Sequence, residues 1–119
     1  MIEIPLDAQI EALANRDAYS LLKAFNINAI DIKPYFHVTR RDLIEYLRKH
    51  PNLARSYLLA LPAQRPYHDQ LVIEQRGAKF VVFNMDHGCP RFEHEYTDIG
   101  EATADFLAWS YAYGFKDEV

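Results

Sequence analysis

Side chains capable of acid–base, nucleophilic or metal chemistry are densest between residues 86 and 94. Asp86, His87, Cys89 and His94 place a carboxylate, two imidazoles and a thiol within nine residues. Zinc sites usually carry paired Cys or His ligands at short fixed spacings, and no second pair follows here. A thiolate–imidazole couple of Cys89 and His94 is the alternative chemistry, although nothing in the spacing indicates an activated thiol. We predict no metal and no cofactor, and interpret the segment as a hairpin turn beside a half-buried His94.

The other histidines and the known catalytic motifs give no support for an enzyme. His37, His50 and His68 are scattered, so their spacing does not predict an acid–base pair. The sequence contains no glycine-rich phosphate loop, no Walker motif, no nucleophile elbow and no H-E-x-x-H zinc motif. These absences favour a protein that is not an enzyme and that has no small-molecule substrate.

Acidic residues are concentrated in the last third of the chain. The net charge of −4 divides into −2 for residues 1–39, +4 for residues 40–91 and −6 for residues 92–119. An electronegative surface can steer and hold a basic partner, and we predict that such a surface binds one here. The predicted partner-binding residues are Glu93, Glu95, Asp98, Glu101 and Asp105, with Tyr111 as an aromatic anchor. The same acids could instead form a solvated face and cap a helix.

A basic group precedes the acidic third and gives an alternative function. It consists of Arg40, Arg41, Arg48, Lys49 and Arg55, with Tyr46 and Tyr57 nearby in sequence. A regulatory or adaptor module could bind protein or nucleic acid through basic helices within residues 40–61. The acidic net charge and the lack of a helix-turn-helix or ribonucleoprotein-type motif argue against nucleic acid. Pairing between this basic face and the acidic third is the simpler expectation.

The composition is that of a small globular protein. The chain has 119 residues, half of them apolar and 25% charged, which predicts a single domain over residues 1–119. Apolar runs are only a few residues long, so we expect no transmembrane helix and no membrane partner. No secretory signal follows Met1 and the chain has a single cysteine, which together predict a cytoplasmic location.

The first part of the chain is predicted to be helical. Two apolar stripes within residues 6–26 are rotated relative to each other. This predicts a helical segment broken near Asn15–Arg16, with Asp17 capping its second part. Residues 27–38 contain Pro34, which disfavours a central strand, so we expect an extended connection or an edge segment there.

Two further helices are predicted before the chain changes character. Thr39 and Asp42 have the spacing of a capping box, which predicts a helix over residues 40–49. A second helix is predicted over residues 52–61, with Asn52 as its cap.

A change from helical to alternating periodicity predicts a sheet in the second half. The predicted strands are 70–75, 78–85 and 91–97, with turns at Arg76–Gly77 and at 87–90. Residues 80–83 are all apolar, so the second strand should be central. In the third strand, strict alternation places Phe92, His94 and Tyr96 on one face and Arg91, Glu93, Glu95 and Thr97 on the other.

A closing helix is predicted over residues 99–113, begun by Asp98 and Glu101 and stopped by Gly114. Its apolar face carries Ile99, Ala102, Phe106, Trp109 and Tyr113, and its polar face carries Glu101, Asp105, Ala108 and Ala112. The predicted class is α+β: a helical N-terminal half, a three-stranded antiparallel meander, and a C-terminal amphipathic helix packed on the sheet.

The closing unit resembles a known type of protein. Lys79–Phe83 followed by a turn, then Thr97–Ala102 and Asp105–Leu107, resemble the strand–turn–strand–helix end of small immunity proteins from bacterial polymorphic-toxin and contact-dependent growth inhibition systems. The resemblance covers slightly more than the last third of the chain and includes no catalytic motif. It implies a cytoplasmic, non-enzymatic protein that binds and neutralises a cognate toxin, often a nuclease. Residue roles do not carry over, so the predicted acidic site rests on charge.

Overall fold

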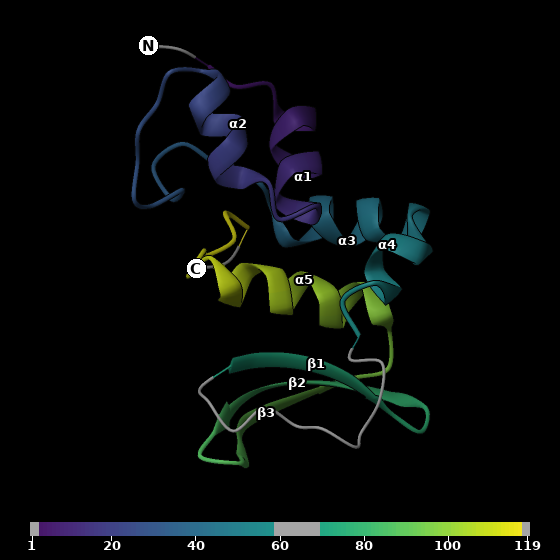
Figure 1. Ribbon diagram of the computed structural model, residues 1–119. Coiled ribbons are helices and arrows are strands. Elements are labelled where there is room, and N and C mark those ends of the chain that lie inside the picture. The colour runs from purple at the N-terminus through teal and green to yellow at the C-terminus, as the bar shows by residue number, and fades with distance from the viewer. Residues whose placement is uncertain (1–2, 59–69, 118–119) are drawn as a thin grey trace.

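The computed structural model describes residues 3–58 and 70–117 of the chain. It confirms the predicted α+β class, with helices first, then a sheet, then a last helix (Figure 1). The helices are α1 (Leu6–Ala14), α2 (Ala18–Ala24), α3 (Arg40–Lys49), α4 (Pro51–Arg55) and α5 (Ile99–Ser110). The strands β1 (Gln70–Arg76), β2 (Lys79–Asp86) and β3 (Cys89–Tyr96) form the predicted three-stranded antiparallel sheet, in the order β1-β2-β3.

Helix α5 is the middle layer of the molecule. It lies between the sheet on one side and α1, α3 and α4 on the other (Figure 1). Because it is covered on two sides, its buried residues run around most of its circumference: Gly100, Ala102, Thr103, Ala104, Phe106, Leu107 and Ala108. The expected polar face is therefore wrong at Ala108, which is buried beneath a neighbouring layer rather than facing water.

Local hydrogen bonds set both ends of α5. At its start, Asp98 accepts a hydrogen bond from the backbone N–H of Glu101 (3.0 Å), as its predicted capping role requires. At its end, the N–H of Tyr113 donates to the carbonyl of Ala108 (2.8 Å) around Ala112, whose φ is +51°. The predicted stop at Gly114 is wrong, because Ala112 takes the left-handed conformation that ends the helix. Helix α5 consequently ends at Ser110.

The helical half begins with two helices, as predicted. Arg16 has a φ of +58°, and the N–H of Asp17 donates to the carbonyl of Ala12 (2.7 Å), which ends α1. Asp17 precedes α2, but its side chain makes no capping hydrogen bond, so that part of the prediction is wrong. The capping box of α3 is confirmed: Thr39 Oγ1 accepts from the Asp42 N–H (3.0 Å), and Asp42 Oδ2 accepts from the Thr39 N–H (3.1 Å).

Helix α4 begins one residue earlier than predicted. Its cap is His50 rather than Asn52, because Pro51 takes the first helical position, where its missing N–H costs no hydrogen bond. Within the described residues α4 ends at Arg55, whereas the end predicted for this helix, 59–61, lies outside the described residues.

Two tight turns fix the register of the sheet. Gly77, with a φ of +62°, joins β1 to β2, and His87 and Gly88, with φ of +51° and +81°, join β2 to β3. Left-handed central residues give a two-residue hairpin the twist that its strands need. Cys89 and Pro90 therefore belong to β3, and the turn predicted over 87–90 is two residues too long.

The two faces of the sheet carry separate apolar clusters. The face toward α5 contributes Ile73, Phe80 and Val82 to the main core. The outer face carries a second, smaller cluster of Val72, Val81, Phe83 and Met85. Strand β2 supplies residues to both clusters, which confirms its predicted central position.

Strand β3 departs from the predicted alternation at Phe92. The pairing of β2 with β3 shifts between Val82 and Asn84, so that β3 carries a bulge. Phe92 has a φ of +58° and is 69% exposed, although alternation placed it with the core-facing residues. Beyond the bulge, His94 and Tyr96 take their predicted places toward α5, where both contact side chains of that helix.

The connection over residues 27–38 contains no helix or strand but enters the core. Ile32, Phe36 and Val38 are fully buried in it. The hydroxyl of Tyr113, just beyond α5, donates a hydrogen bond to the carbonyl of Val38 (2.7 Å) and so holds the end of this connection in place.

The free energy of unfolding is expected to fall as the pH rises from about 10 to about 12. Burial raises the pKa of Tyr113 to about 12, whereas an unfolded tyrosine titrates near ~10. In this interval the unfolded chain has released the phenolic proton and the folded chain retains it, so rising pH favours unfolding. Chemical denaturation at stepped pH values measures the slope.

The matched variant is Tyr113→Phe, which removes the titrating hydroxyl and keeps the ring. It should be less stable than the original protein near neutrality, because the Val38 carbonyl loses the shorter of its two hydrogen bonds and keeps only that from the Lys116 N–H (3.4 Å), but it should lose less stability across the alkaline interval. Equal slopes in the two proteins would assign the alkaline effect to other groups.

Candidate functional site

The outer face of the sheet, which points away from α5, holds the first two predicted partner-binding residues. Glu93 Oε2 lies 2.7 Å from Nη1 of Arg76, and Glu95 Oε2 lies 3.2 Å from Nζ of Lys79. Both acids therefore pair with bases that precede them in the chain. Their side chains remain 34% and 55% exposed, so both are still accessible to a partner.

Arg76 is the centre of this outer face. Its guanidinium also binds the carboxylate of Glu74, whose side chain is only 11% exposed, and lies 5.1 Å from the centroid of the Phe83 ring. Burial by itself lowers the pKa of Arg76, but hydrogen bonds to Glu74 and Glu93 outweigh it and raise the pKa. A carboxylate as buried as Glu74 requires a paired base, and Arg76 supplies it.

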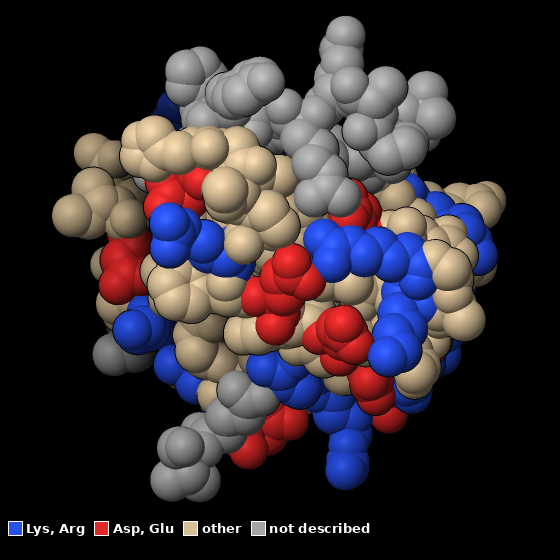
Figure 2. Space-filling view, turned by 90° about the horizontal axis from the view of Figure 1, so that it is seen from below, with Lys and Arg blue, Asp and Glu red and all other residues tan. Residues whose placement is uncertain are grey.

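Opposite charges alternate across this face. Figure 2 looks at the sheet from its outer side and shows acidic and basic side chains next to one another. On this face Arg76 and Lys79 lie against Glu74, Glu93 and Glu95. The described outer face is thus a mosaic of both charges rather than the uniformly acidic surface that the chain segments suggest.

Asp98 and Glu101 bind α3 instead of the outer face. Arg48 Nη2 lies 3.3 Å from Asp98 Oδ2 and 3.8 Å from Glu101 Oε1. This contact confirms the expected pairing of the basic helices with the acidic third. It joins the N-terminus of α5 to α3, and Asp98 caps α5 at the same time.

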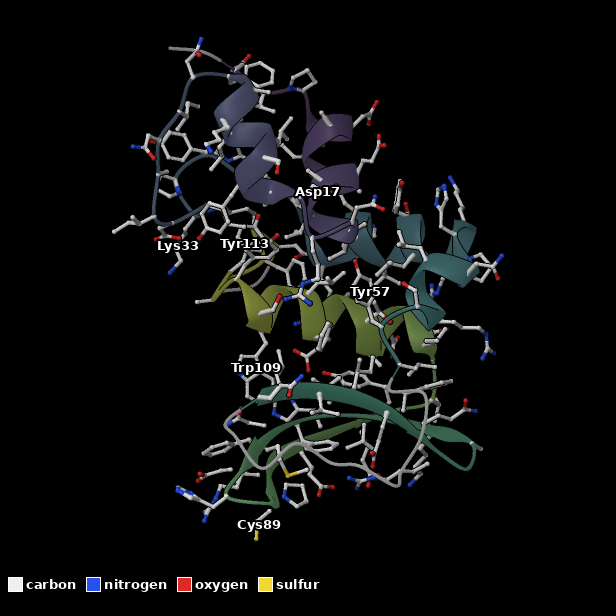
Figure 3. All side chains as sticks on the ribbon, in the orientation of Figure 1. Asp17, Lys33, Tyr57, Cys89, Trp109 and Tyr113 are labelled. Carbon is white, nitrogen blue, oxygen red and sulfur yellow. The ribbon has the colours of Figure 1, made fainter. Side chains whose placement is uncertain are left out.

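Asp105 faces inward, between α5 and β3. Its Oδ2 accepts a hydrogen bond from the Tyr96 hydroxyl (2.7 Å) and lies 3.0 Å from Nδ1 of His94, and its side chain is only 14% exposed. The His94 ring stacks on Trp109, which Figure 3 shows projecting from α5 toward the sheet. Burial, reinforced by the bond to Asp105, raises the pKa of Tyr96. Asp105 therefore fastens the last strand to the central helix.

Tyr111 contacts α2 at the other end of α5. Its hydroxyl accepts a hydrogen bond from the Ala18 N–H (3.3 Å), and its ring lies 5.7 Å from that of Tyr19. Burial raises the pKa of Tyr111. The six predicted residues therefore do not share one surface: only Glu93 and Glu95 lie together on the outer face of the sheet.

Part of the alternative basic site is engaged within the fold, through Arg48 as described above and through the start of α3. The backbone N–H groups of Arg40 and Arg41 donate to the carboxylate of Asp117 at 2.9 and 3.4 Å. The Arg40 guanidinium lies 4.6 Å from the centroid of the Phe115 ring. A depression of about 300 Å³ at this place is lined by equal numbers of bases and acids: Arg40, Arg41, Arg48, Glu45, Glu101 and Asp117. This balance gives no electrostatic advantage to a polyanion.

The potential catalytic couple is separated. Cys89 is exposed at the start of β3, at the far side of the sheet from α5 (Figure 3). His94 lies five positions further along the same strand, which at the usual strand rise is roughly 15 Å away. His68 lies outside the described residues. Within residues 3–58 and 70–117, no group of three His, Cys, Asp or Glu side chains could hold a metal ion.

Phe92 is the surface residue that sequence reasoning missed. It is the most exposed aromatic side chain in the described part of the chain, and it is flanked by Arg91 and Glu93. A phenylalanine in the left-handed region is a conformational outlier that costs about 1–2 kcal/mol. The available signal was Pro90 followed by charges, because proline and charge mark an irregular edge strand.

Comparisons with known proteins identify no relative. The chain matches no protein-family model, no curated protein and no solved structure. In the described segments, no helix combines the length and apolar character that crossing a bilayer requires. Function is therefore inferred from this chain's own residues and geometry.

Proposed function

We propose that the protein is a cytoplasmic immunity or inhibitor protein, which is not an enzyme and which binds a cognate toxin domain through the β3 surface. This surface consists of Phe92, Glu93 and Glu95. The observation that carries the proposal is Phe92, an aromatic ring that is 69% exposed and held at a φ of +58°.

Phe92 has the properties of an interface anchor. Strained backbone persists only where the surrounding structure holds it, and it is concentrated at functional sites. Buried aromatic anchors surrounded by polar groups provide most of the binding energy in many interfaces. In the free protein the ring of Phe92 is in water, and Glu93 and Glu95 of the same strand supply nearby polar groups.

The partner is expected to contact side chains rather than extend the sheet. Strand β3 lies at one end of the strand order, but Pro90 and the bulge beside Phe92 interrupt its regular pairing. Proline, bulges and charged side chains are the features that prevent another strand from adding to an exposed edge. Recognition through the exposed ring of Phe92 and its charged neighbours is compatible with the proline, the bulge and the charged side chains of this edge.

The charges of the β3 surface favour a partner that carries basic groups. Glu93 and Glu95 are partly exposed and paired with Arg76 and Lys79, so they can exchange these internal pairs for basic groups of a partner. A nuclease toxin would supply such groups, because it neutralises phosphates with Lys and Arg. Surface charges of this kind act mainly on the rate of association.

Co-expression tests the proposal directly. The partner to use is the C-terminal domain of a large secreted protein encoded next to this chain, if the adjacent reading frame encodes one. The two proteins should co-purify, and growth arrested by the toxin domain should be restored. The double variant Glu93→Lys/Glu95→Lys should associate with the toxin domain more slowly and with less salt dependence. The matched control is Glu11→Lys/Glu45→Lys, which reverses two exposed helix charges outside the β3 surface. If no complex forms and growth is not restored, the proposal is refuted.

A further inference from the structure

A groove lies in the helical layer, remote from the sheet. It is formed between residues 3–9 and residues 27–37, encloses about 840 Å³, and is called here the N-terminal groove. In Figure 1 these segments lie at the opposite end of the molecule from β1, β2 and β3. Its volume falls within the range of small-molecule sites, about 300–1,000 Å³.

Most of the groove lining is apolar, and part of it is left in water. The apolar lining residues are Ile4, Pro5, Leu6, Ile27, Pro34 and Tyr35. Leu6 and Tyr35 are 44% and 37% exposed, and they are two of the few large apolar or aromatic side chains exposed in the described residues. A ligand with an apolar body would remove both from water and gain the usual hydrophobic stabilisation.

The buried amide of Gln9 holds the two walls together. Gln9 is 3% exposed, its Nε2 donates to the carbonyl of Ile4 (2.8 Å), and its Oε1 accepts from the N–H of His37 (2.7 Å). One side chain thus bridges both segments, and the groove exists before any ligand binds. A preformed site avoids the ordering cost that weakens binding to a mobile one.

The polar groups of the groove define the head group of its ligand. The Gln9 amide is used within the fold, and the other polar lining side chains are Glu3 and His37. Glu3 is the only carboxylate among the lining residues, and within the described part of the chain it makes no ion pair. A groove lined by both a carboxylate and an aromatic ring favours an ammonium group, which can pair with the acid or lie against the ring.

We propose that the N-terminal groove binds a small amphipathic amine, with its apolar body against Leu6 and Tyr35 and its ammonium group at Glu3. The inference goes beyond toxin binding and does not depend on it, because none of the lining residues belongs to the β3 surface.

Two matched probes test the proposal on the full chain: phenethylamine and hydrocinnamate, which share a phenylethyl body and differ in the charge of the head group. Amide resonances of Ile27, Tyr35 and His37 should shift saturably with the amine in heteronuclear NMR spectra. The amine should bind about tenfold more tightly than the acid, since one head group attracts Glu3 and the other repels it.

Variants separate the charge from the apolar contact. Glu3→Gln should weaken amine binding about twofold to fivefold and leave or improve binding of the acid. Glu45→Gln, at an exposed glutamate of α3, should change neither. Leu6→Ser should weaken both probes. Equal affinity for the two probes, shifts spread outside the groove, or no saturable shift would each overturn the proposal, whatever the outcome of toxin co-expression.

Discussion

Replacing Phe36 with alanine is expected to lower the free energy of unfolding by about 3–5 kcal/mol, although Phe36 lies in a connection without helix or strand. Its side chain is fully buried and belongs to the main core. Removing it leaves a cavity that the fixed chain around Ile32 and Val38 can fill only in part, because both neighbours are themselves fully buried. Urea denaturation followed by circular dichroism measures the change.

The adjacent residue provides the control. Tyr35 is 37% exposed, so Tyr35→Ala should cost about 1 kcal/mol or less. Unfolding midpoints that coincide for the two variants would contradict the claim that this connection is part of the core. A larger loss for Tyr35→Ala than for Phe36→Ala would contradict it more strongly.

Replacing Phe92 with glycine is expected to change stability and partner binding in opposite directions. Glycine adopts a φ of +58° without steric cost, so stability should rise by up to about 1 kcal/mol after the extra entropy of glycine in the unfolded chain is subtracted. The same change removes the proposed anchor, and affinity for the toxin domain should fall by about 2–4 kcal/mol. Thermal denaturation and titration calorimetry measure the two effects.

The variant Phe92→Ala separates the effect of the aromatic ring from the effect of the backbone conformation. Alanine removes the ring but keeps the Cβ that makes the left-handed conformation costly, so binding should fall as in the glycine variant without the gain in stability. If both variants bind the toxin domain as the original protein does, Phe92 is not an anchor and the β3 surface is not the contact.

Local signals in the sequence predicted most of the fold. The Thr39–Asp42 box, the break after Asn15 and the switch to alternation near Gln70 each depend on neighbouring residues, and the structure confirms all three. Two of the errors, at the end of α5 and on β3, fall where an ordinary residue takes an unusual conformation. Ala112 and Phe92 are both left-handed, and neither residue type indicates it.

Which acid pairs with which base could not be predicted, because the partners are distant in sequence. Arg76 precedes Glu93 by 17 positions and Arg48 precedes Asp98 by 50, yet each pair is in contact. The contrast between a basic middle and an acidic last third therefore reflects which segments face one another in the fold. The net charge of a chain segment therefore does not describe a surface, because folding places segments of opposite charge next to one another.

The central position of α5 also determines when the fold can be completed. Helices α1, α3 and α4 and the three strands all contact α5, and α5 follows all of them in the chain. As the chain is synthesised, both outer layers are therefore produced before the layer that joins them. Domains fold as units, and apolar surface that is still uncovered attracts chaperones and promotes aggregation. The ribosome must thus deliver Ile99–Ser110 before either outer layer gains its partner, so these layers cannot complete the domain until α5 has been made.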